Sequence, residues 1–181
     1  MRYLPISIQQ YIFTFIAPQQ CKQFLQHCKP KHLLPVLWMI KNQWKELGTY
    51  IPKIAVQYGH IEVFRQACDM KVPIGNDAIT SAIIGGHLPI IQIAHENGYC
   101  FTTWNMASAA HYGQFHVVKY LHTHCPDRIW TKWVPAFAVL SGSLEIVRYA
   151  HENGCEWDEY TLNNAIRYGH DNIVEYYLAN S

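Results

Sequence analysis

The chain has 181 residues, of which 50% are hydrophobic and 15% are charged, and its formal net charge is +1. This hydrophobic content predicts a buried core and excludes an intrinsically disordered chain. A net charge so close to zero gives no broad field that attracts phosphate backbones or anionic lipid. We therefore expect neither a nucleic-acid partner nor a membrane partner.

The cysteines and the N-terminus indicate a cellular compartment. The six cysteines contain no Cys-x-x-Cys pair, which predicts free thiols in a reducing compartment. Pro5, Gln9 and Gln10 interrupt the first apolar stretch, so we predict no secretory leader. The chain also lacks an apolar run of about 18 residues, the length that a membrane span needs. We expect a cytoplasmic protein that is not secreted.

Residues 1–47 form a segment of their own, because they do not share the period of the rest of the chain. Their apolar side chains recur at helical spacing, and Pro18 interrupts the pattern. One interpretation is a helical cap that covers the apolar face of the first repeat, as stacked repeats require.

A second interpretation rests on a motif in this segment. Leu4-Pro5 is followed in one ungapped register by Ile12-Phe13, Ile16 and Cys28-Lys29. In this register the segment resembles an F-box, although Ser7 and Lys31 replace an acidic residue and a tryptophan of the usual pattern. The resemblance implies docking on a Skp-type adaptor of a cullin ubiquitin ligase. The docking side chains would be Leu4, Pro5, Ile8, Ile12, Phe13 and Ile16.

Residues 48–181 repeat internally. Glycines stand at positions 59, 86, 113, 142 and 169, separated by 27, 27, 29 and 27 residues, and we call them the turn glycines. Four residues before them stand Ala55, Ala82, Ala109, Ala138 and Ala165. Four and five residues after each turn glycine stands an apolar pair, such as Val117 and Val118. Agreement at this many positions predicts about five structural units.

Each unit is predicted to contain two helices. Apolar residues at two, four, five and eight positions after the turn glycine trace one face of a second helix. Gly98 and Gly154 suit the C-terminal cap of that helix. Residues 78–84 and 161–167 predict a shorter first helix. The unit of 29 residues is two residues longer than the others, and we assign the two extra residues to the connector at 125–131. One helix pair cannot bury its apolar faces alone, so the units are expected to stack as a solenoid.

The repeated pattern Ala-x-x-x-Gly-His-Leu/Ile, followed by Val-Val or Ile-Val, resembles the ankyrin repeat. The units are roughly six residues shorter than the consensus, like the short repeats of giant DNA viruses, amoebae and oomycetes. The resemblance implies an all-α, helical-hairpin solenoid of about five ankyrin-like repeats over residues 48–181, preceded by the F-box-like module or cap. If the chain is viral, its compartment is the host cytoplasm.

The resemblance also implies a binding groove. In ankyrin-like stacks the two residues before the turn glycine face the groove, and tyrosine and arginine dominate binding hot spots. The predicted groove residues are Gln57, Tyr58, Ile84, His111, Tyr112, Leu140, Arg167 and Tyr168. The alternative is that the tyrosines pack between units. Tyr120, Tyr149 and Tyr176, seven residues after their glycines, are expected to pack in this way.

The histidines raise the question of metal or catalytic chemistry. His95, His122 and His151 recur nine residues after their turn glycines, which is typical of a structural role. The cluster of His122, His124 and Cys125 offers three zinc ligands, but no fourth follows at a zinc-finger spacing, so an irregular loop is favoured. No phosphate-binding loop or nucleophile motif occurs. We expect no enzyme activity, no metal and no cofactor.

These observations predict a monomeric protein–protein interaction module. The leading hypothesis is that it recruits a target protein to a cullin-type ubiquitin ligase through the F-box-like head. The alternative is a stand-alone ankyrin scaffold or decoy without a ubiquitin link. Asp171, at a normally apolar position, and Asn164 suggest that the fifth unit is a polar terminal one.

Overall fold

The computed structural model describes residues 50–57, 59–125 and 130–180. Within these ranges the chain forms ten helices and no strand, which confirms the all-α prediction. The predicted head, residues 1–47, lies outside the described residues, and so does Tyr58.

The described helices form five pairs, and a turn glycine separates the two members of each pair. The first helices are α4 (Tyr50–Gln57), α6 (Asn76–Ile84), α8 (Thr103–His111), α11 (Trp133–Leu140) and α13 (Glu159–Tyr168). The second helices are α5 (Ile61–Asp69), α7 (Leu88–Glu96), α9 (Phe115–His124), α12 (Leu144–Glu152) and α14 (Asp171–Ala179).

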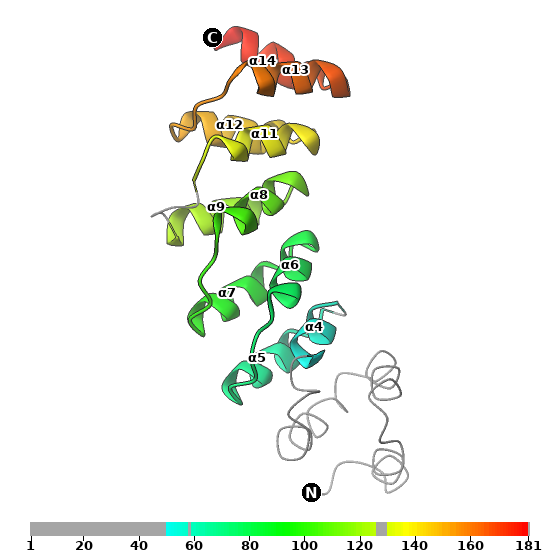
Figure 1. Ribbon diagram of the computed structural model, residues 1–181, viewed down its shortest axis with the longest axis vertical. Coiled ribbons are helices and arrows are strands. Elements are labelled where there is room, and N and C mark those ends of the chain that lie inside the picture. The colour runs from blue at the N-terminus through cyan, green and yellow to red at the C-terminus, as the bar shows by residue number, and fades with distance from the viewer. Residues whose placement is uncertain (1–49, 58, 126–129, 181) are drawn as a thin grey trace, which may run out of the picture.

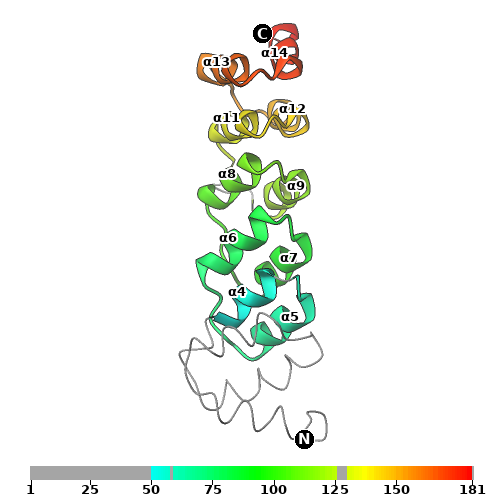
Figure 2. The same cartoon turned by 90° about the vertical axis from the view of Figure 1, so that its right-hand side faces the viewer.

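The pairs follow one another along the long axis of the molecule (Figure 1). Each first helix contacts the first helices of the neighbouring units, and each second helix contacts the neighbouring second helices. Figure 2 shows the two sets as separate columns, with α4, α6, α8, α11 and α13 on one side and their partners on the other. The described part of the chain is thus a two-layered stack of helix pairs.

The first helices begin earlier than the periodicity predicts, because the capping residues lie outside the repeated pattern. Helix α13 begins at Glu159, two residues before the predicted position. Asp158 fixes this start, since its Oδ1 accepts a hydrogen bond from the Thr161 backbone N–H at 3.1 Å. At the start of α8, Thr102 and Asn105 form a reciprocal capping box.

Glycine is required at the turns for conformational reasons. Gly142 has a φ of +68°, in the left-handed region that other residues enter only with strain. A Cβ atom at this position would also lie 2.7 Å from Cε1 of His170 in the next unit. Gly98 and Gly154 likewise have positive φ values of 83° and 79°. They directly follow the C-cap residues Asn97 and Asn153, so the left-handed glycines predicted at the ends of second helices are confirmed.

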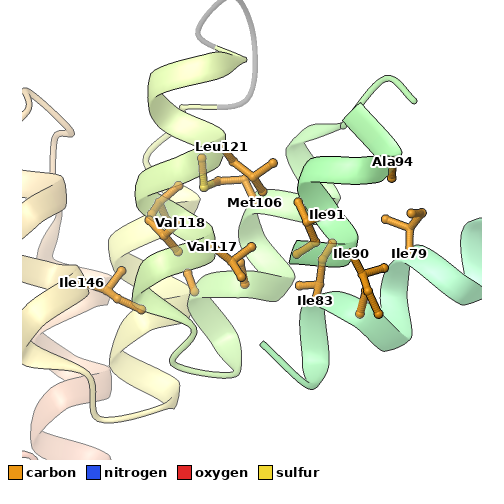
Figure 3. Close-up of a cluster of buried hydrophobic side chains, with 14 of the residues drawn as sticks. Ile79, Ile83, Ile90, Ile91, Ala94, Met106, Val117, Val118, Leu121 and Ile146 are labelled. Atoms are coloured by element: carbon orange, nitrogen blue, oxygen red, sulfur yellow. The ribbon is translucent and has the colours of Figure 1, made fainter. Parts of the chain in front are cut away.

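The core runs between the two layers from one unit to the next. All five alanines that precede the turn glycines are buried, which allows close packing of the first helices. In Figure 3, Ile79 and Ile83 of α6 lie against Ile90 and Ile91 of α7. Met106 and Leu121 continue the cluster into the next unit (Figure 3). The buried side chains form one contiguous cluster over the described units.

The fifth unit differs from the polar terminal unit that we expected. Asp171 is exposed, but Asn164 is buried, and its Nδ2 has no hydrogen-bond partner among the described residues. The exposed side chains of this unit include Ile166 (59%) and Leu178 (66%). The expectation is therefore wrong for Asn164, because this side chain is enclosed within the stack while apolar side chains face solvent.

Candidate functional site

The predicted groove residues lie at the C-terminal ends of the first helices. Gln57, Ile84, His111, Tyr112, Arg167 and Tyr168 are exposed, and Leu140 is half-buried. Tyr58 lies outside the described residues. The described groove residues other than Leu140 are thus accessible to a partner on one side of the stack.

The structure adds a set of exposed aromatic side chains that the sequence argument missed. Trp104, Trp133 and Tyr160 each stand nine residues before a turn glycine, on α8, α11 and α13. Their exposed fractions are 65%, 52% and 59%. These helices are consecutive and in contact, so the three side chains occupy one register across the stack. We call them the aromatic row.

Helical geometry connects the aromatic row to the predicted groove. Positions nine, five and two residues before the turn glycine share a helix face, because they are separated by about one turn each. On this face the Phe137 ring centroid lies 6.3 Å from that of Trp104 and 6.4 Å from that of Trp133. The Phe137 ring also lies 6.0 Å from His111, whose ring is 4.9 Å from Tyr112. The row and part of the groove are therefore one continuous aromatic surface.

The aromatic row carries polar atoms that have no partner among the described residues. The indole N–H of Trp130, outside the row, donates to the Asn153 carbonyl oxygen at 3.2 Å. By contrast, the indole N–H groups of Trp104 and Trp133 find no acceptor within the described part of the chain. Lys132 Nζ lies 5.8 Å from the Trp133 ring centroid. This lysine forms no ion pair with any described side chain.

A different set of contacts joins the second helices. The Nδ1 atoms of His95, His122 and His151 share hydrogen bonds of 3.0, 2.9 and 3.1 Å with the hydroxyls of Tyr120, Tyr149 and Tyr176 in the next unit. We call this set the histidine–tyrosine ladder. The described structure thus places these tyrosines in contacts between units, as expected.

Stacking and burial reinforce the ladder. The His122 ring stacks on Trp130 with centroids 4.0 Å apart, and His151 stacks on Trp157 at 4.1 Å. Burial lowers the pKa of His122, because desolvation disfavours the charged imidazolium. Burial also raises the pKa of Tyr149. Both shifts favour the neutral forms of these two side chains at neutral pH.

The candidate zinc ligands do not converge. His122 is bonded to Tyr149, and His124 turns back onto its own helix, with Nδ1 3.0 Å from the Tyr120 carbonyl oxygen. The Cys125 Sγ atom instead lies 3.9 Å from His95 Nε2. Among the described residues, no group of three histidine, cysteine or acidic side chains is arranged to hold a metal ion.

The described cysteines, at positions 68, 100, 125 and 155, are free thiols. Burial raises the pKa of Cys68 and of Cys155 to about 11. These two thiols are therefore protonated at neutral pH and are not available as thiolate nucleophiles.

Comparisons with known protein families, curated proteins and solved structures find no match to this chain. The evidence on function therefore comes from the exposed side chains of the described residues.

Within the described ranges, no helix has the length and apolar character needed to cross a membrane. The feature that calls for a functional explanation is the aromatic row with its adjoining groove residues, since tryptophan, tyrosine and arginine dominate protein-binding hot spots.

Proposed function

We propose that the chain is an ankyrin-type solenoid that binds another protein through the exposed face of its first helices. The observation that carries this proposal is the aromatic row. Three large aromatic side chains in one register, each more than half exposed, leave apolar area in water that a partner would cover. Neighbouring groove residues extend this surface toward the turn glycines.

The ankyrin assignment is supported by agreement between the sequence pattern and the packing. The alanines that the pattern places before each turn glycine are buried between neighbouring helices. The described connectors at 70–75 and 97–102 contain no strand, in accord with units shorter than the ankyrin consensus. Without β-hairpin fingers at these connectors, binding depends more strongly on the first helices.

The proposal extends to a recruiting role. The register of Leu4-Pro5, Ile12-Phe13 and Ile16 favours an F-box-like head that docks on a Skp-type adaptor, while the repeats select a target for the cullin ligase. These residues lie outside the described part of the chain. The second candidate, a scaffold or decoy, uses the same repeats and differs only in lacking this docking function.

Co-purification with a Skp-type adaptor separates the two candidates. We expect the full chain to retain the adaptor and an Ile12→Asp, Phe13→Asp double variant to lose it, because charges replace apolar anchors. A Leu178→Asp variant, altered at an exposed position on α14, serves as the matched control. If the wild-type chain retains no adaptor, the recruiting role is rejected and the scaffold function stands.

The binding face is tested separately from the head. In affinity capture from cells of the natural source, partners of the wild-type chain should be lost from a Trp104→Ala, Trp133→Ala variant and kept by Leu178→Ala. All three side chains are exposed, so these variants should retain their fold, which circular dichroism checks. Equal capture by all three proteins would show that the partner binds elsewhere.

A further inference from the structure

We propose that the aromatic row binds a proline-rich segment in the polyproline II conformation, with an acidic residue near Lys132. This inference rests on the proposed function and names the class of ligand that the first-helix face takes. Its grounds are the spacing of the row, the hydrogen-bonding groups it offers and its local charge.

First helices packed at the usual distance would space the row close to the repeat of a polyproline II helix. Trp104, Trp133 and Tyr160 occupy one register on consecutive packed helices, and packed helix axes lie about 8–10 Å apart. A polyproline II helix has three residues per turn and rises about 3.1 Å per residue, so one face recurs every ~9 Å. A segment lying across the first helices would therefore present an equivalent side chain to each successive aromatic ring.

A further aromatic ring lies between two members of the row. The half-buried Phe137 ring contacts both Trp104 and Trp133, so aromatic surface extends between the two indoles. Proline-rich segments commonly dock in aromatic-lined grooves because their preformed conformation loses little entropy on binding. Two prolines three residues apart would lie one between Trp104 and Trp133 and the other between Trp133 and Tyr160.

Hydrogen bonding favours this ligand over a helix or a strand. The indole N–H groups of Trp104 and Trp133, which find no acceptor among the described residues, are donors. A polyproline II backbone has free carbonyl acceptors, while its prolines lack N–H. A partner helix uses most of its carbonyl oxygens internally. A partner strand needs a sheet edge, and the described residues contain no strand.

The positive charge of Lys132 beside the row favours an acidic residue at one position of the ligand. Lys132 lies over the Trp133 ring and has no carboxylate partner among the described side chains. An acidic residue of the ligand near Trp133 would complement this charge. At the other end of the row, Glu159 directly precedes Tyr160, which disfavours a second acidic residue there. The ligand is thus a proline-rich segment with a single acidic position facing α11.

The test uses a fluorescent peptide, Ser-Pro-Pro-Glu-Pro-Pro-Ser-Pro-Pro, which spans ~28 Å as polyproline II. Its anisotropy is titrated with the full chain. A peptide with glycine in place of every proline tests the conformation, and one with lysine in place of glutamate tests the charge. We expect saturable binding of the proline–glutamate peptide and weaker binding of both controls.

Variants of the chain locate the peptide. Trp104→Ala with Trp133→Ala should weaken binding at least ~10-fold, as loss of hot-spot residues does, while Leu178→Ala should leave it unchanged. Lys132→Glu should reverse the preference between the glutamate and lysine peptides. Thermal midpoints verify that each variant is folded.

Three results would overturn the inference: no binding of the proline–glutamate peptide, equal binding of the glycine peptide, or unchanged binding by the double tryptophan variant. If the peptide does not bind but the double variant still loses its protein partners in affinity capture, the ligand class is wrong and the proposed binding face stands. If neither readout depends on the tryptophans, both proposals fail.

Discussion

Ile83 and Ile166 both stand three residues before a turn glycine, on α6 and α13. Ile83 is fully buried because α8 of the next unit packs beside α6, whereas Ile166 is 59% exposed. The same residue type at the same register thus belongs to the core in one unit and to the surface in another. At the scale of single residues, the contribution of a side chain to stability depends on the unit that covers it.

This pair gives a matched test of the packing. Ile83→Ala should lower the free energy of unfolding by about 2–5 kcal/mol, through lost burial and the cavity that remains. Ile166→Ala should change it by only about 0.5 kcal/mol, because its side chain is mostly in water. Chemical denaturation of the two variants measures both values. Similar losses would mean that Ile166 is covered in solution.

The aromatic row could not be predicted from the repeat pattern alone. Trp104, Trp133 and Tyr160 share a register, which is visible in the sequence as an aromatic nine residues before a turn glycine. The ankyrin resemblance, however, assigns the binding groove to the two residues next to the glycine. Whether the earlier position is exposed depends on how first helices pack side by side, which the period alone does not reveal.

The features of the helices that the sequence predicts are those set by contacts within a unit or with the next unit. The turn glycines, the buried alanines and the second helices recur because every unit makes the same turn and packs its helices in the same way. Helix starts were predicted less well, since Asp158 and the Thr102–Asn105 pair are caps particular to their own units. The tyrosine positions were expected to join units, but their histidine partners were not foreseen.

The hydrogen bonds of the histidine–tyrosine ladder should stabilise the stack measurably. Tyr149→Phe removes the hydroxyl that bonds to His122 and should cost about 0.5–1.5 kcal/mol. Tyr160→Phe is the control, because this exposed hydroxyl has no partner among the described residues and should matter little. Denaturant titrations of both variants make the comparison. Equal stabilities would indicate that the ladder contributes only through ring packing.

The ladder also predicts a pH dependence. Burial lowers the pKa of His122, so the folded chain binds this proton less readily than the unfolded chain, whose histidines titrate near ~6.5. As the pH falls below this value, the unfolded state takes up a proton that the folded state does not. The contribution of His122 to stability is therefore fully present above ~6.5 and decreases as the pH falls toward the folded pKa.

A His122→Asn variant isolates this effect. The difference in unfolding free energy between the wild-type chain and the variant should shrink between pH values of about 7.5 and about 5.5. Urea titrations at several pH values measure it. A difference that stays constant or grows toward acid would contradict the assigned direction of the pKa shift.

Every extensive contact between described helices joins two helices of one unit or of neighbouring units. Helix α9 packs between α7 and α12, whereas α14 packs against α12 and α13 on one side alone. In such an array, stability is approximately a sum over units and their interfaces. The elongated arrangement in Figure 1 therefore predicts uneven local stability along the chain.

Hydrogen–deuterium exchange measures this unevenness. Amides of α14 should exchange faster than those of α9, because opening α14 breaks contacts with fewer neighbouring helices. Uniform protection of α9 and α14 would mean that the stack unfolds as one cooperative block.

The central claim is that a partner covers the exposed face of the first helices. The most direct test is site-specific photo-cross-linking in cells of the natural source, with a benzophenone side chain in place of Trp133 on α11 or of Leu178 on α14. Both positions are exposed, so the probe is accessible in each protein. The account predicts a cross-linked partner from position 133 and none from position 178. A partner cross-linked only from position 178 would contradict it.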